Sequence, residues 1–159
     1  MQKYNSPYEE QQARILRLRK QLDQFTIADG SNFEDAVDAF TSFFIQCYHL
    51  RDWLIQRGTD KKKINKEILQ DRWLSLCRDI ANTQKHQKIT QYEPANRFVD
   101  YGLGISTPIC KYYDPFDQVS RFGIPIWEVG KPTDALQVAD NCISSWKKLV
   151  SNNPGVSCA

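Results

Sequence analysis

Residues 31–54, SNFEDAVDAFTSFFIQCYHLRDWL, decide the fold of this 159-residue chain. Ser31 and Glu34 have the spacing of a capping box, in which each side chain satisfies a backbone N–H at the start of a helix. Apolar residues then recur at steps of three and four up to Leu54, and Arg57-Gly58-Thr59 supplies a stop. The stretch predicts a long amphipathic helix with this apolar face: Phe33, Val37, Phe40, Phe44, Cys47, Leu50 and Leu54.

Three more segments have helical periodicity. Residues 7–27 follow Ser6-Pro7, a typical helix start, and residues 65–87 form a third amphipathic helix. The last helix starts near Pro132-Thr133-Asp134 and ends at Asn153-Pro154-Gly155. In chain order, their expected apolar faces are Ile15, Leu18, Leu22 and Phe25; Leu69, Trp73, Leu76, Ile80 and Thr83; and Ala135, Ala139, Cys142, Trp146 and Leu149.

Residues 89–130 differ from the rest because prolines, glycines and aromatics replace the helical pattern. Short runs at Arg97–Tyr101, Ile109–Tyr113 and Ile124–Val129 are typical of strands, although a loop covering the bundle is the alternative. The predicted fold class is therefore mainly α: an antiparallel bundle of about four helices with a small β-hairpin or three-stranded insertion before the last helix. A single domain is expected over residues 1–159, with a frayed tail at 153–159.

Composition narrows the function classes. The chain has 21 basic and 19 acidic residues, so its surface is not basic overall, but Lys61-Lys62-Lys63 with Lys66 could form a local basic patch. A solvated interhelical loop is the simpler interpretation of those lysines.

Five cysteines without a CxxC spacing, and no apolar leader, favour a reducing cytoplasm. No apolar run is long enough to span a membrane, so we expect no membrane association.

Both histidines lie in polar clusters on predicted helices. Ser75, Asp79, Asn82 and His86 are four, three and four residues apart, which places them on one strip beside the apolar face, where a bundle meets solvent or a partner. His49, Asp52 and Trp53 lie roughly opposite the main apolar face of the second helix. Each cluster also has a structural interpretation, in which His49 pairs with Asp52 and the residues on the strip hydrogen-bond the following loop.

The candidate site residues come from these clusters. The candidates for proton transfer, positioning and charge stabilisation are His86, Asn82, Asp79 and Arg78, and the candidates for ligand binding are His49, Arg51, Asp52 and Lys85. The sequence has no HxxxH or HExxH spacing, no Walker loop and no GxSxG motif, and we expect no metal and no cofactor. Three of the five cysteines, Cys47, Cys77 and Cys142, fall on apolar faces, where a thiol acts as a small buried hydrophobe.

The segment Arg78-Asp79-Ile80-Ala81-Asn82-Thr83-Gln84-Lys85-His86 resembles the motif of the HEPN superfamily, helical-bundle proteins that include metal-independent ribonucleases of bacterial toxin and phage-defence systems. Their motif is an arginine, a polar residue, three variable residues and a histidine. Asn82 and His86 match it, whereas Ala81 stands where the arginine belongs. The resemblance implies a homodimer with a shared cleft, His86 as general acid or base, and Asn82 as a positioning group. Arg78 or Arg51 would then supply the missing charge.

Two function classes follow. The first is a HEPN-like bacterial accessory protein that binds RNA or a nucleotide, with or without metal-independent cleavage, and the lack of the motif arginine favours the noncatalytic form. The second is a noncatalytic partner-binding or regulatory protein of a mobile-element or defence repertoire. In that class an exposed patch around Tyr113 and Trp127 would contact another protein.

Overall fold

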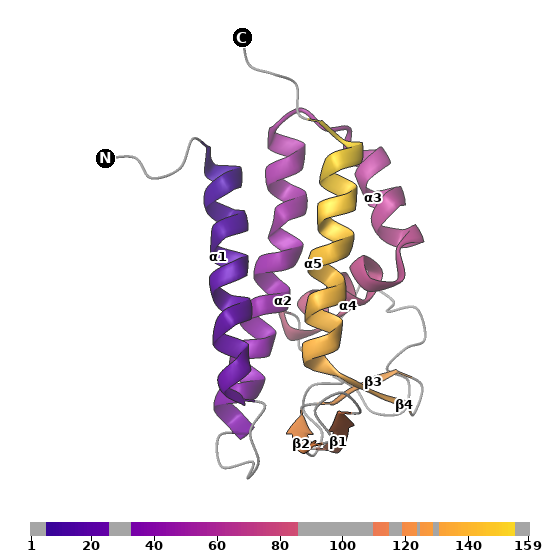
Figure 1. Cartoon of the computed structure of the whole chain (residues 1–159). Helices are drawn as coiled ribbons and strands as arrows, with labels where there is room; N and C mark the ends of the chain where they lie inside the picture. The colour runs from indigo at the N-terminus through magenta and orange to yellow at the C-terminus, as the bar shows by residue number, and fades with distance from the viewer. Residues whose placement is uncertain are drawn as a thin grey trace, which may run out of the picture.

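The computed structural model describes residues 6–25, 33–85, 110–114, 119–123, 125–128 and 131–154. Within these ranges the chain is mainly α-helical, and the first long helix runs in the opposite direction to the second and to the last (Figure 1). The helices are α1 (Pro7–Leu22), the 3-10 turn η1 (Asp23–Phe25), α2 (Phe33–Gln56), α3 (Lys61–Gln70), α4 (Arg72–Lys85) and α5 (Ala135–Asn152). The predicted fold class, an antiparallel bundle with a β insertion before the last helix, is confirmed.

Helix α1 begins where the sequence predicts. The Ser6 side chain accepts a hydrogen bond from the backbone N–H of Glu9 at 3.2 Å, and Pro7 occupies the first turn. The helix ends at Leu22 and tightens into η1, which is earlier than the predicted end at residue 27. Residues 26 and 27 lie outside the described part of the chain.

Helix α2 lies between α1 and α4 and is buried on both sides. The expected apolar face is confirmed at Phe40, Phe44, Cys47, Leu50 and Leu54, which are all buried, while Val37 is only half-buried. Because α2 packs against two helices, Phe43 is buried as well, with its ring centroid 5.3 Å from that of Phe44 in an edge-to-face arrangement. Gly58 then adopts a φ of 98°, which ends the helical region at the predicted stop.

The predicted helix over 65–87 is wrong in one respect, because the chain forms two helices that meet at Asp71. The Asp71 carboxylate accepts hydrogen bonds from the backbone N–H groups of Trp73 and Leu74 at 2.8 and 3.0 Å, and so starts α4 as a new helix. The break changes the helical phase. Leu69, expected in the core, is therefore 58% exposed, whereas Ile64 and Ile68 are buried.

The lysine run is also helical, not the loop that was predicted. Asp60 caps α3 by accepting from the backbone N–H of Lys63 at 2.8 Å, so Lys61-Lys62-Lys63 forms the first turn. Lysine is unfavourable beside the positive end of a helix dipole. The cap offsets that cost, and the lysine side chains remain exposed.

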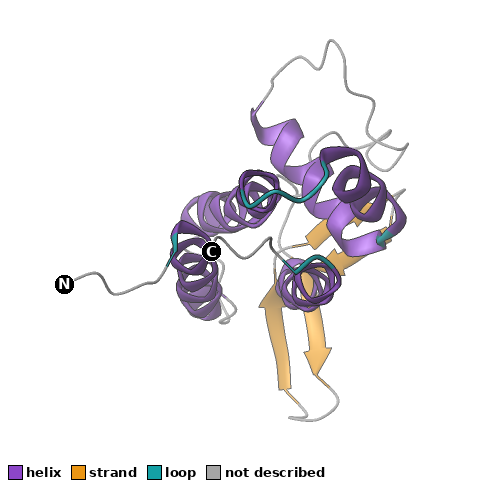
Figure 2. Ribbon diagram, turned by 90° about the horizontal axis from the view of Figure 1, so that it is seen from above, coloured by secondary structure: helices purple, strands orange, loops and turns teal. Residues whose placement is uncertain are grey.

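The insertion contains two antiparallel hairpins, which lie at the lower end of the bundle in Figure 1, and one of them extends beyond the helices in the view from above (Figure 2). In the first, β1 (Cys110–Asp114) pairs with β2 (Val119–Gly123), and in the second, β3 (Pro125–Glu128) pairs with β4 (Lys131–Asp134). The predicted strands at Ile109–Tyr113 and Ile124–Val129 correspond to β1 and β3, while their partners were not predicted. The strand predicted at Arg97–Tyr101 lies outside the described residues.

Helix α5 follows β4 directly. The Asp134 side chain accepts from the backbone N–H of Leu136 at 3.2 Å, which confirms the predicted start of this helix. All five of its expected apolar residues are buried: Ala135, Ala139, Cys142, Trp146 and Leu149. In the described part of the chain, no helix combines the length and apolar character needed to cross a membrane.

Candidate functional site

The structure places most of the candidate residues on two helices that pack against each other. Helix α2 carries His49, Arg51 and Asp52, and α4 carries Arg78, Asp79, Asn82 and Lys85. His86, the residue on which a cleavage reaction would depend, lies one position beyond α4 and outside the described residues. The side chain of Lys85 is likewise not described. The remaining candidates can be followed one by one.

Asp79 lies in the interior of the bundle. Its side chain is completely buried, and Oδ1 accepts hydrogen bonds from Nε and Nη2 of Arg78 at 3.2 and 2.9 Å. Ser75, one turn earlier on the same strip, is also buried, and Asn82 is half-buried. The expectation that the strip begins at a solvent-facing edge is therefore wrong for its first two members. Helix α4 packs against α2, α3 and α5, so even its polar strip is enclosed.

Arg51 and Arg78 lie near one tyrosine, which the sequence prediction missed. Burial raises the pKa of Tyr48, and the guanidinium groups of Arg51 and Arg78 act in the opposite direction. Tyr48 is half-buried on α2, and the two arginines come from α2 and α4. We call Tyr48, Arg51 and Arg78 the arginine–tyrosine cluster. The spacing of Tyr48 and Arg51, three residues apart on α2, was the available signal.

Arg51 also joins this cluster to α3. Its Nε donates to Oδ1 of Asn65 at 2.7 Å, and its Nη1 donates to Oδ1 of Asp52 at 2.9 Å. Asp52 is therefore bound by its neighbour Arg51, while its side chain stays 61% exposed. His49 is half-buried on the same helix. Arg51 and Arg78 both lower the pKa of Tyr48, whereas His49 takes part in none of these hydrogen bonds.

The exposed lysines of α3 begin one turn away from Asn65. Lys61, Lys62, Lys63 and Lys66 are all exposed, and none forms an ion pair with a residue that the structure describes. Lys62 precedes Asn65 by three residues and Lys66 follows it directly, so the lysines flank the side chain that binds Arg51. Four lysine side chains are therefore exposed along this one helix.

Three thiols lie in the core, and each is buried on an apolar helix face as predicted. Cys47, Cys77 and Cys142 come from α2, α4 and α5, and all are buried and free. The Sγ of Cys77 donates to the carbonyl of Phe44 at 3.4 Å, and the Sγ of Cys142 donates to that of Trp73 at 3.3 Å. Burial raises the pKa of Cys47 and of Cys142 well above the ordinary value. These two thiols stay protonated and serve as small core side chains.

Over the ranges that the structure covers, no group of three or more histidine, cysteine, aspartate or glutamate side chains is placed to hold a metal ion. The side chains of Tyr113 and Trp127, the predicted protein-contact patch, are not described, although their backbones lie in β1 and β3.

Comparison with known proteins gives no match: no family model fits the chain, and neither a curated protein nor a solved structure matches it. The HEPN resemblance therefore stays a prediction.

Proposed function

We propose that this protein is a HEPN-like bacterial accessory protein that binds single-stranded RNA without cleaving it. The exposed lysines of α3 would contact the phosphate backbone. The observation that carries the proposal is four exposed lysines without a carboxylate partner among the described residues. Cationic groups that are not neutralised within the protein are those that can release counterions from a nucleic acid.

Two features favour binding over cleavage. Asp79 is enclosed and engaged with Arg78, so it is not placed to exchange protons with a bound substrate. Ala81, which stands at the motif arginine position, is buried and brings no charge to a cleft. Transition-state stabilisation of phosphoryl transfer needs a cation aimed at the reacting phosphate. We further propose a cytoplasmic homodimer, which is the assembly that the resemblance implies.

The proposal is tested by fluorescence anisotropy with a labelled 20-nucleotide single-stranded RNA in buffer containing EDTA, over a range of KCl concentrations. We expect binding at low salt whose affinity falls as salt rises. Replacing two lysines in Lys62→Ala/Lys66→Ala should weaken binding and reduce the slope of log K against log salt by about 1 to 1.5, because each phosphate contact on a single strand contributes about 0.7.

The matched control removes the same charge elsewhere. Arg17 and Lys20 are exposed on α1, across the bundle from α3 (Figure 1), and Arg17→Ala/Lys20→Ala should leave the slope unchanged. If both double variants lost RNA affinity and salt slope equally, binding would be nonspecific electrostatic attraction without a defined site, and the proposal would be contradicted. The same RNA on a denaturing gel should remain intact. Degradation that His86→Ala abolishes would replace the proposal with the ribonuclease interpretation.

A further inference from the structure

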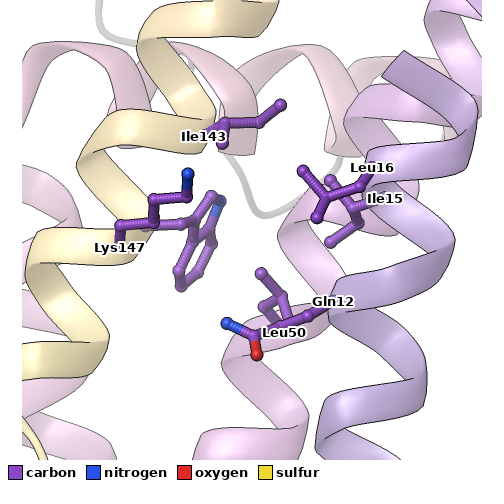
Figure 3. A pocket seen from close by; sticks show the side chains of 7 residues that line it. Gln12, Ile15, Leu16, Leu50, Ile143 and Lys147 are labelled. Atoms are coloured by element: carbon purple, nitrogen blue, oxygen red, sulfur yellow. The ribbon is translucent and has the colours of Figure 1, made fainter. Parts of the chain in front are cut away.

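A pocket of about 230 Å³ opens between α1, α2 and α5, away from the α3 lysines. Figure 3 shows Ile143 and Lys147 of α5 facing side chains of α1 across the opening, with Leu50 of α2 behind them. Its walls are mainly apolar, and the two polar side chains in them are those of Gln12 and Lys147. The full lining is Gln12, Ile15, Leu16, Leu50, Ile143, Trp146 and Lys147. Concave apolar sites with a few placed polar groups are typical of ligand-binding sites.

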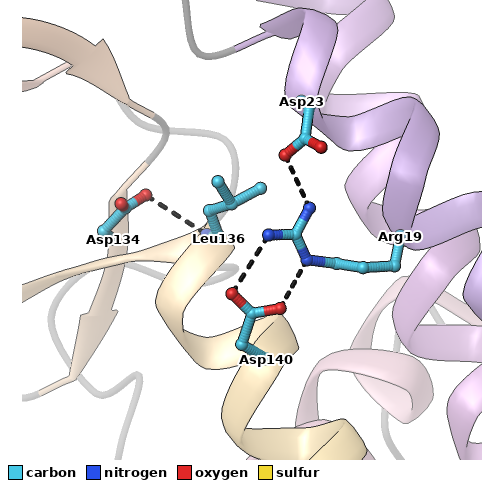
Figure 4. Close-up of polar contacts among 5 residues, drawn as sticks. All are labelled: Arg19, Asp23, Asp134, Leu136 and Asp140. Atoms are coloured by element: carbon cyan, nitrogen blue, oxygen red, sulfur yellow. Dashed lines mark hydrogen bonds and ion pairs between the residues drawn. The ribbon is translucent and has the colours of Figure 1, made fainter.

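The pocket lies next to the Arg19–Asp140 contact along the line where α1 and α5 face each other, which we call the seam. At one end of the seam, Arg19 bonds both carboxylate oxygens of Asp140 and also reaches Asp23 (Figure 4). We call these three residues the seam clamp. One helical turn away, Leu16 and Ile143 line the pocket, and one turn further Gln12 and Lys147 do so. The two helices therefore present a charged level, an apolar level and a polar level in order.

Two side chains at this pocket, Leu16 and Lys147, are exposed and lack a partner of matching chemistry within the described part of the chain. Leu16 is 52% exposed and is one of the two large hydrophobic residues found exposed there. Lys147 is exposed, and no ion pair joins its ammonium group to a carboxylate of a described residue. An apolar wall that ends at a cation is complementary to a molecule with an apolar body and one negative charge.

We propose that this pocket binds a small amphiphilic monocarboxylate. Its apolar body would lie between Leu16, Ile143 and Trp146, and its carboxylate would accept hydrogen bonds from Lys147 Nζ and the Gln12 side-chain amide. The volume is roughly one and a half times that of an engineered 150 Å³ cavity that holds benzene, so a body of about eight to ten non-hydrogen atoms fits. This site is independent of the proposed RNA-binding face.

The probe is sodium octanoate, and the readout is the set of ¹H–¹⁵N shifts of the intact chain during titration. Octanoate should shift resonances of the pocket residues and bind more tightly than butyrate, which lacks most of the apolar body, or octylammonium, which has the opposite charge. Lys147→Met keeps the apolar stem of the side chain and should weaken octanoate about tenfold, as expected for loss of a hydrogen bond to a charged group. Lys148→Met is the matched control and should leave octanoate affinity unchanged, because Lys148 does not line this pocket.

A second pair of variants uses exposed positions that tolerate charge without unfolding the protein. Leu16→Glu places a carboxylate at the mouth of the pocket and should abolish octanoate binding, whereas Leu69→Glu, at the other exposed leucine, should not. No shift at millimolar octanoate would overturn the proposal, as would equal weakening by Lys147→Met and Lys148→Met. A dimer that Leu16→Glu dissociates, without any octanoate effect, would assign the surface to a second copy of the chain and would also overturn it. None of these outcomes changes the RNA anisotropy experiment.

Discussion

The α2–α4 interface and the α1–α5 seam use charged residues in opposite ways. Between α2 and α4 the core is continuous, and the Asp79 side chain is fully buried and forms an ion pair with Arg78. Along the α1–α5 seam the two helices are joined by the seam clamp at one end, and a pocket remains beside it. The difference shows that a charged side chain in the core, such as Asp79, is paired within the protein, whereas a cation at the open seam, such as Lys147, remains able to bind a ligand.

The largest effect that can test this comparison is expected from Asp79→Ala. The change deprives Arg78, whose side chain is only 16% exposed, of a buried carboxylate, and such losses cost about 3 kcal/mol or more in the free energy of unfolding. Asp52→Ala is the control, because Asp52 is 61% exposed beside Arg51 and should cost about 0.5 kcal/mol or less. Urea unfolding measures both. Similar values for the two variants would show that Asp79 is not part of the scaffold.

A smaller effect is expected at the seam clamp. Arg19→Ala and Asp140→Ala should each cost about 1 kcal/mol, because the two-point contact is well formed but Asp140 is 56% exposed. Asp23→Ala removes the ion pair between Arg19 of α1 and the first residue of η1 and should cost about 0.3 to 0.5 kcal/mol. A double-mutant cycle between Arg19 and Asp140 measures their coupling. No coupling would mean that the two helices are not joined at this point.

The smallest effect concerns pH and the other end of α1. The Tyr8 ring lies under the guanidinium of Arg57 at 4.5 Å, and burial raises the pKa of Tyr8 to about 12. In the unfolded chain this phenol ionises near pH 10, so its contribution to stability is complete below pH 10 and is lost as the pH rises toward 12. Relative to Tyr8→Phe, the unfolding free energy of the unmodified chain should therefore fall across that range. If the unfolding free energies of the two proteins changed in parallel with pH, the raised pKa of Tyr8 would be contradicted.

Much of the fold could be predicted because helix formation depends on local patterns. The apolar faces of α2 and α5, and the caps at Ser6 and Asp134, can be identified from neighbouring residues alone. The break at Asp71 could not be identified in this way. Residues on both sides of it favour helix, and the side chain of Asp71 was not recognised as a cap inside a continuous periodic run.

The candidate site was less predictable, because it depends on contacts between helices. The strip through Ser75 and Asp79 has the spacing of a solvent-facing edge, but the packing of α2, α3 and α5 around α4 encloses it. The link between Arg78 and Tyr48 depends on the packing of α4 against α2, which the sequence does not show. The pocket at Leu16 and Lys147 has no signal in either helix alone, since its two walls are more than a hundred residues apart in the chain.

The most direct test of the central claim is the salt dependence of RNA binding by the unmodified chain and by Lys62→Ala/Lys66→Ala in metal-free buffer. The account predicts binding at low salt, a slope reduced by about 1 to 1.5 in this variant, and no change in Arg17→Ala/Lys20→Ala. No RNA binding at the lowest salt concentration, or equal slopes in all three proteins, would contradict it.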